Sequence, residues 1–192
     1  AQELQFFKNN QGHDLIAPSI LPKNTTLFTS KCFENFKQYR RQLINGLVKK
    51  HQKNNYDKKL SLLKTEHKDE FVSWIDSEIT WFVVENSSGL NSGLILQLAR
   101  GVQVENYITI HADSIFDYRQ QKIFKWSELK YLSNLCNKPE AATYVYASIL
   151  NNQLLLTKDA TLIKSIINDF KSEKTLSHST DFKNCIHELN YD

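Results

Sequence analysis

The sequence predicts an α/β fold, a three-layer sandwich with a mostly parallel sheet, preceded by an N-terminal helical extension. From Ile79 to Lys171, short segments rich in β-branched and aromatic residues alternate with segments of helical periodicity, and such alternation is typical of parallel sheets covered by helices. The residues before Ile79 show helical patterns without this alternation. The chain has 192 residues, of which 41% are hydrophobic, so it can bury a real core. We therefore expect a helical extension over 1–78, an α/β domain over 79–171 and a polar C-terminal tail over 172–192.

Two helices are expected in the extension. The stretch CFENFKQYRRQLINGLVKKH carries one apolar stripe at three- and four-residue steps, with Lys and Arg on the other side; the stripe comprises Phe33, Phe36, Tyr39, Leu43 and Leu47. The stretch LSLLKTEHKDEFVSWIDSE predicts a second helix with Phe71 and Trp74 among its core positions.

Within the α/β domain we expect three strands and four helices. ITWFVVE, VENYITIHA and QLLL have the length and composition of strands, and NSSGLNSG is a turn. The expected helices are GLILQLARG, SELKYLSNLCN, PEAATYVYASILNN and ATLIKSIINDFK. Pro139 suits the first turn of the third of these helices, and Asn151-Asn152 suits its end.

The charge is mildly positive overall but concentrated in one segment. The net charge is +3, yet the segment from Lys37 to Lys59 contains eight Lys and Arg residues against the single acid Asp57. Such a segment predicts attraction to phosphate backbones, and a solvated helix face is the alternative reading. The candidate nucleic-acid-binding residues are Lys37, Arg40, Arg41, Lys49, Lys50 and Lys53.

The cysteines and the hydropathy of the sequence indicate the cellular compartment in which the protein is expected. Cys32, Cys136 and Cys185 form neither a CxxC pair nor a disulfide framework, which favours a reducing, intracellular and cytoplasmic setting. No apolar run approaches the length of a transmembrane helix, so no membrane partner is expected.

Four acids stand where expected strands end or helices begin. Glu85 ends the first strand, Asp117 follows the second (with Asp113 as its rival), Glu140 starts a helix and Asp159 follows the third strand. If the strands are parallel, these carboxylates meet at one rim, where Mg²⁺ or Mn²⁺ would offset their repulsion and activate water on a phosphodiester. The alternative is structural, because Asp159 also suits a helix N-cap and Glu140 suits the positive end of a helix dipole.

These segments resemble PIN-domain nucleases. WFVVENSSGLNSGLI is similar to the opening strand and turn of that family, and PEAATYVYASILNNQLLLTKDATL is similar to its later helix and strand. The resemblance implies an α/β/α sandwich and a Mg²⁺- or Mn²⁺-dependent ribonuclease, with Glu85, Asp117, Glu140 and Asp159 as catalytic and metal-binding acids. The family normally has Asp where this chain has Glu85, and a helix-borne glutamate is missing. HDLIAPSILPK offers a second, conflicting match to the same opening strand.

Two hypotheses therefore stand. The first is a divalent-metal-dependent ribonuclease with RNA as its partner, and the second is a non-catalytic domain that binds a protein partner within a larger assembly. Asp117, Glu128 and Lys130 also make a D…ExK spacing like that of restriction-type nucleases, and the six histidines show no zinc-ligand spacing. No dinucleotide-binding, Walker A, GxSxG or HExxH motif occurs.

Overall fold

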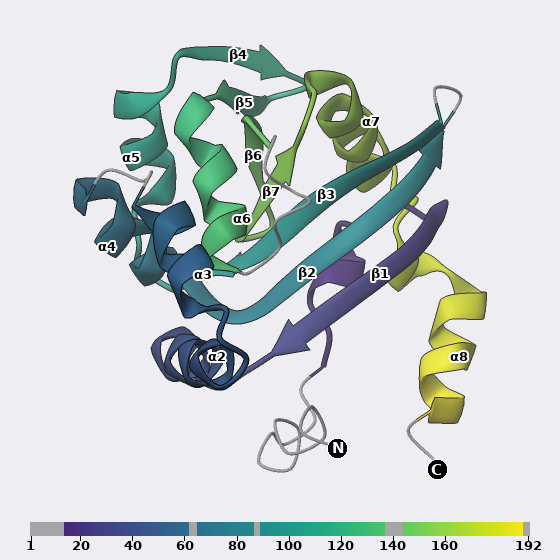
Figure 1. Cartoon of the computed structure of the whole chain (residues 1–192). Coiled ribbons are helices and arrows are strands. Elements are labelled where there is room, and N and C mark those ends of the chain that lie inside the picture. The colour runs from purple at the N-terminus through teal and green to yellow at the C-terminus, as the bar shows by residue number, and fades with distance from the viewer. Residues whose placement is uncertain (1–13, 62–64, 87–88, 137–143, 190–192) are drawn as a thin grey trace.

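A single antiparallel sheet organises the computed structural model, which describes residues 14–61, 65–86, 89–136 and 144–189 (Figure 1). Its seven strands lie in the order β1-β2-β3-β7-β6-β5-β4, and every neighbouring pair is antiparallel. The strands are β1 (Thr25–Cys32), β2 (Ile75–Asn86), β3 (Gly89–Leu98), β4 (Ser114–Tyr118), β5 (Gln121–Lys125), β6 (Tyr146–Leu150) and β7 (Gln153–Thr157).

Helices pack against both faces of this sheet. One face is covered by α2 (Phe36–Lys49), α3 (Lys53–Leu60), α4 (Thr65–Trp74), α5 (Val104–His111), the 3₁₀ helix η2 (Ser127–Tyr131) and α6 (Leu132–Leu135). The other face is covered by η1 (Ala17–Ser19), α7 (Ala160–Lys171), η4 (Leu176–His178) and α8 (Thr180–Leu189). None of the described helices has the length and apolar character needed to cross a membrane.

The prediction of a mostly parallel sheet in a three-layer sandwich is wrong. GLILQLARG does not form the predicted helix: its residues Gly93 to Leu98 belong to β3, the second arm of a long hairpin with β2. Within PEAATYVYASILNN, Tyr146–Leu150 is β6, and Asn151 and Asn152 (φ 48° and 58°) form the tight turn into β7. Two successive residues with positive φ are the requirement of a two-residue hairpin turn, and asparagine tolerates them. Hairpins therefore replace the crossovers that a parallel sheet needs.

Of four other predicted strands and helices, three agree with the structure and one differs from it. The strand predicted at Ile79–Glu85 lies within β2, QLLL lies within β7, and ATLIKSIINDFK is α7, so these three predictions are confirmed. VENYITIHA, expected as a strand, forms α5 instead, with Val104 and Ile108 buried one helical turn apart.

The expectation of a helical extension preceding the sheet is also wrong. β1 pairs with β2 over most of its length, and α2 and α4 contribute to the same hydrophobic cluster as the sheet. Within the segment predicted as a polar tail, α8 packs Phe182 against Phe28 of β1 at a ring-centroid distance of 6.0 Å.

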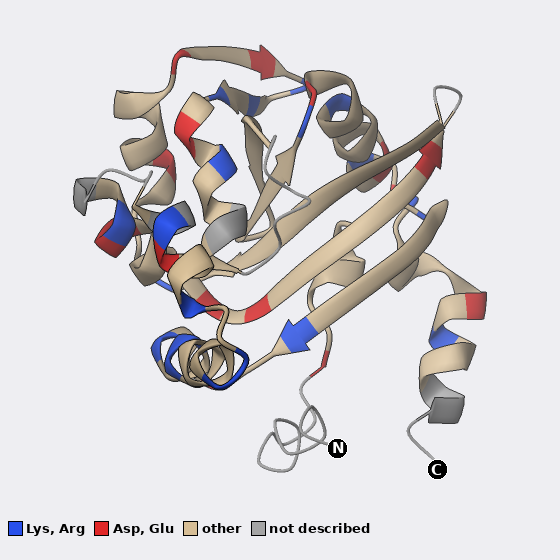
Figure 2. Ribbon diagram, viewed as in Figure 1, with Lys and Arg blue, Asp and Glu red and all other residues tan. Residues whose placement is uncertain are grey.

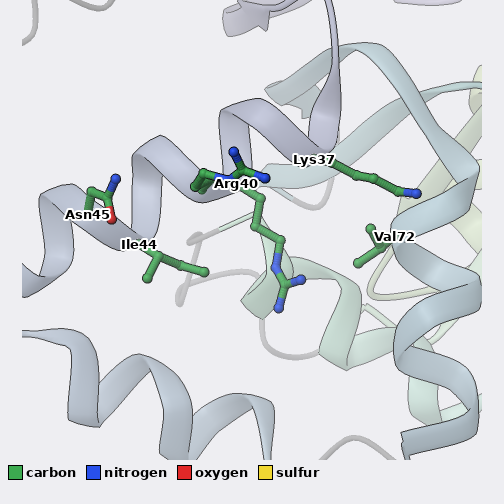
Figure 3. Close-up of a pocket in the computed structure, with 6 residues that line it drawn as sticks. Lys37, Arg40, Ile44, Asn45 and Val72 are labelled. Atoms are coloured by element: carbon green, nitrogen blue, oxygen red, sulfur yellow. The ribbon is translucent and has the colours of Figure 1, made fainter.

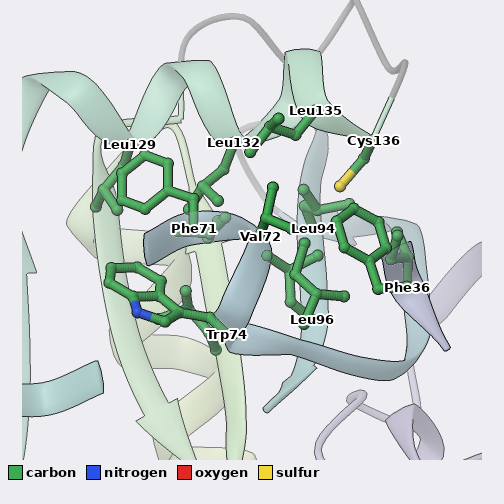
Figure 4. Packing of buried hydrophobic residues seen from close by; sticks show 14 of the residues in the cluster. Phe36, Phe71, Val72, Trp74, Leu94, Leu96, Leu129, Leu132, Leu135 and Cys136 are labelled. Carbon is green, nitrogen blue, oxygen red and sulfur yellow. The ribbon is translucent and has the colours of Figure 1, made fainter. Parts of the chain in front are cut away.

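The core consists of two clusters separated by the sheet. The α2 face, defined by the residues that pack under α2 and α4, includes Phe36, Phe71, Trp74, Leu94, Leu96 and Leu132 (Figure 4). The α7 face, defined by those that pack under α7, includes Phe82, Ile95, Leu155, Ile163 and Ile166. Successive residues of β3 alternate between the two clusters, so this central strand is buried on both sides.

A buried carboxylate fixes the N-terminal segment to the sheet. Glu78 of β2 is only 3% exposed, and its oxygens accept hydrogen bonds from Ile16 N (2.6 Å), Ser30 Oγ (3.0 Å) and Thr80 Oγ1 (2.7 Å). A buried charge is tolerated where such donors surround it, so Glu78 joins β1, β2 and the start of η1.

Candidate functional site

Asp159 is a helix cap. Its Oδ1 atom accepts hydrogen bonds from Thr161 N at 2.8 Å and Leu162 N at 3.0 Å, as an N-cap residue does for the first turn of its helix. Its carboxylate thus turns back to α7 on the α7 face. This geometry is that of a helix N-cap, as the structural alternative for Asp159 predicted.

The other acids of the predicted metal site lie elsewhere. Glu85 and Asp117 are exposed on β2 and β4, which stand five places apart in the sheet, or about 24 Å across the strands at ordinary strand spacing. A metal ion binds its oxygen ligands at about 2.0–2.6 Å, so these two carboxylates do not share one. Glu140 lies outside the described residues. Among the residues that are described, no three His, Cys, Asp or Glu side chains form a group suited to a metal.

The rival acids also have structural partners. Asp113 Oδ2 accepts a hydrogen bond from Ser127 N at 2.9 Å, at the start of η2. The D…ExK spacing does not assemble on a strand, because Glu128 and Lys130 both belong to η2. Glu128 contacts His67 Nε2 at 3.4 Å, and Lys130 Nζ lies 5.0 Å from the ring centre of Tyr131.

The predicted basic residues lie closer together than the predicted acids do, because most of the basic residues belong to α2. Asn35 caps this helix by accepting a hydrogen bond from Gln38 N at 3.1 Å, and no acidic residue occurs between Phe36 and Lys49. Phe36, Tyr39 and Leu47 are the buried residues of the helix. Helical periodicity therefore turns Lys37 and Arg41 outward, and Figure 2 shows positive charge along α2.

An open pocket of about 280 Å³ lies beside this basic side of α2. Its lining residues on α2 are spaced by three and four, as one helical stripe requires; they are Lys37, Arg40, Arg41, Ile44 and Asn45. Val72 of α4 lines the opposite wall, and Lys37 extends toward it (Figure 3). The pocket thus combines three cations with an apolar wall.

Arg40, which lines this pocket, lies beside Tyr56 of α3. The Tyr56 side chain is buried, and its O–H donates to Leu135 O at 3.3 Å. Burial raises the pKa of the Tyr56 phenol, whereas the hydrogen bond and charge of the neighbouring Arg40 guanidinium lower it. Because the Tyr56 hydrogen points to Leu135, the oxygen is left to accept from Arg40.

One donor of Arg40 is unsatisfied. Arg40 Nε is buried and has no hydrogen-bond acceptor within the described parts of the chain. A buried donor without an acceptor costs about 1–3 kcal/mol, so the site favours a ligand that brings an acceptor to it.

The basic surface continues past the end of α2. Lys49 and Lys50 are exposed, and the described residues place no carboxylate within ion-pair distance of Lys37, Arg41, Lys49 or Lys50. Lys53 on α3 is partly neutralised, because its Nζ lies 3.7 Å from Asp57. Lys49 also suits the negative end of the α2 dipole.

Two further groups of interacting side chains could not be predicted from the sequence: Arg40 with Tyr56, and the cluster around His67. Tyr56 of α3 lies beside Arg40 of α2, and nothing in the sequence around Tyr56 indicates that contact. His67 is 2% exposed, and its Nδ1 lies 2.7 Å from the Tyr107 hydroxyl while its Nε2 faces Glu128. The rings of Phe71 and Trp126 pack against His67, so this cluster joins α4, α5 and η2 inside the α2 face.

These residues are the whole basis for assigning a function. No protein-family model, no curated protein and no solved structure matches the chain.

Proposed function

We propose that this protein binds RNA through the basic surface of α2 and the start of α3, by contacts to the phosphate backbone. The observation that carries the proposal is a row of cations without carboxylate partners in the described structure, set beside a pocket that holds a buried, unsatisfied arginine donor. Phosphate oxygens supply both the negative charge and the acceptors that such a surface lacks.

The spacing of this surface supports an extended polyanion. Lys37, Arg41, Asn45 and Lys49 follow one another at four-residue intervals, which places them along one side of the helix over about 18 Å. Several successive phosphates of one strand can therefore contact the same helix. Three of these four side chains are cations, and Asn45 can donate a neutral hydrogen bond between them.

The proposal retains the binding step of the ribonuclease hypothesis and not its cleavage step. Cleavage by clustered carboxylates requires acids within reach of one metal ion, and Asp159, Glu85 and Asp117 occupy separate places in the fold. The proposal is thus closer to the second hypothesis, with RNA as the partner in place of protein.

Fluorescence anisotropy with a labelled single-stranded RNA of about 12 nucleotides tests the proposal. We expect the double variant Lys37→Ala/Arg41→Ala to weaken binding at least tenfold and to lower the slope of log K against log salt by about 1.4, that is, about 0.7 for each lost phosphate contact. The matched control is Lys158→Ala/Lys183→Ala, because both lysines are exposed, on or next to helices of the α7 face. It removes the same charge and should leave the affinity nearly unchanged.

Two results would refute RNA binding at this surface. One is equal loss of affinity in both double variants, which would mean that net charge alone is sensed. The other is equal binding of RNA and of poly-glutamate at matched charge and salt, which would indicate an acidic protein as the partner.

A further inference from the structure

The pocket beside α2 is built differently from the exposed ridge next to it. Lys49 and Lys50 are exposed cations on the surface. Arg40 instead lies beside the buried Tyr56, and its Nε has no acceptor among the described residues. A guanidinium that is held in place loses less side-chain entropy when it binds an anion. This part of the surface is therefore preorganised for one anionic group.

The positive charge around the pocket is larger than the single negative charge of one internal phosphate. Lys37, Arg40 and Arg41 bring three positive charges to one hollow, and an internal phosphodiester carries one negative charge. A terminal phosphate carries about 1.5 to 2 negative charges at neutral pH and three acceptor oxygens. It matches the pocket better in both charge and number of acceptors.

The shape of the pocket also favours a terminal phosphate over an internal one. An internal phosphate has chain on both sides and lies along a surface, whereas a terminal phosphate can enter a hollow end-on. The volume of about 280 Å³ exceeds that needed for a phosphate alone, and Ile44 and Val72 give the remaining space an apolar wall. The sugar and base of the terminal nucleotide can pack against such a wall.

We infer that the pocket formed by Lys37, Arg40, Arg41, Ile44 and Val72 binds the phosphomonoester end of an RNA chain, with Arg40 as the residue that distinguishes a phosphorylated end from a hydroxyl end. This inference rests on the proposed RNA-binding function. Tyr56 is a positioning residue, because it acts on the ligand only through Arg40.

The test compares RNAs of one sequence that differ only at their ends. Their Kd values are measured by anisotropy with an internal label for a 5′-phosphorylated, a 3′-phosphorylated and an unphosphorylated oligonucleotide. We expect at least one phosphorylated form to bind the native protein about tenfold more tightly than the unphosphorylated form. A nucleoside monophosphate used as competitor separates the two sources of this chemistry, since a pocket for free nucleotides would bind it as tightly as the phosphorylated RNA.

Three variants assign the preference to the pocket. Arg40→Lys keeps the charge but loses the planar donor set, so the ratio of Kd values should fall to about twofold or less. Tyr56→Phe should lower the same ratio while leaving the Kd of unphosphorylated RNA unchanged. Lys49→Ala, outside the pocket, should weaken all RNAs alike and preserve the ratio. Circular dichroism and thermal melting of each variant establish that the fold is retained.

The outcomes separate this inference from the proposed function. If native protein binds all three RNAs equally, the phosphomonoester pocket is refuted and backbone binding stands. If it binds none of them, the proposed function itself has failed. A preference for phosphorylated ends that survives in Arg40→Lys and Tyr56→Phe would place the discriminating site elsewhere and would also overturn the inference.

Discussion

Gly93→Ala is the substitution that tests the sheet most directly. Gly93 lies in the middle of β3, opposite Phe82 of β2 and Thr157 of β7. A Cβ atom added there would lie 2.5 Å from Cε1 of Phe82, closer still to its Cζ, and 2.9 Å from the carbonyl oxygen of Leu156. All three approaches are well inside ordinary van der Waals contact.

The surrounding atoms cannot easily move away from the added methyl group. Phe82 is fully buried among Ile95, Leu155 and the residues of α7, and the third contact is backbone. Overpacking of this kind costs about 1–3 kcal/mol. The smaller entropy of the unfolded chain offsets about 0.4–1 kcal/mol of that cost. We therefore expect a net destabilisation of about 1–2 kcal/mol, which corresponds to a fall in Tm of about 2–8 °C for a domain of this size.

Gly46→Ala is the matched control. Gly46 is in the interior of α2, and a Cβ atom there would meet nothing within 4 Å. Alanine is favoured over glycine in a helix by about 0.8–1 kcal/mol, so this variant should be more stable than the native protein. The same chemical change thus has opposite expected signs at the two sites.

Urea unfolding followed by tryptophan fluorescence measures both free energies of unfolding. Phe82→Leu should recover part of the loss when it is combined with Gly93→Ala, because a smaller side chain vacates the space that the new methyl group needs. If Gly93→Ala is as stable as the native protein, or if Phe82→Leu does not interact with it, then β3 does not pack against Phe82 as described.

Further predictions concern a cap, a buried acid and the thiols. Asp159→Ala should lower the free energy of unfolding by about 1 kcal/mol while Asp159→Asn is nearly neutral, because the side chain caps α7; urea midpoints that do not distinguish the two variants would contradict this role. Glu78→Ala should cost on the order of 3 kcal/mol by leaving its buried donors without an acceptor, and limited proteolysis should then cut the segment around Ile16 first. Burial above all, with the Glu78 carboxylate adding to it, raises the pKa of the Cys32 thiol from 9.0 to about 11. Mass spectrometry after iodoacetamide treatment at pH 8 should therefore find the exposed Cys185 alkylated long before Cys32. Because folded Cys32 keeps its proton to a higher pH than unfolded Cys32, the free energy of unfolding should fall as the pH rises from about 9 to 11, and a Cys32→Ser variant should show less of that fall.

Local patterns of the sequence determined several elements correctly. α2 and α7 each bury one stripe of residues, and that periodicity is visible in any single stretch of chain. QLLL and ITWFVVE are short and strongly apolar or β-branched, and both are strands. The basic character of α2 and of the residues that follow it is likewise a property of neighbouring residues, so the six candidate binding residues could be named without a fold.

Only the tertiary structure decided how these elements meet. GLILQLARG was expected to be helical because a strand buried on both faces has a continuous apolar run, which looks the same as a buried helix over so few residues. Val104 to His111 contains β-branched residues and is nevertheless α5, because packing of Val104 and Ile108 outweighs a weak propensity. The turn at Asn151-Asn152 makes β6 and β7 antiparallel, and the strand order of the sheet separates Glu85 on β2 from Asp117 on β4. The position of Arg40 against Tyr56 depends on two separate helices, and a contact between segments distant in the chain leaves no pattern in either of them.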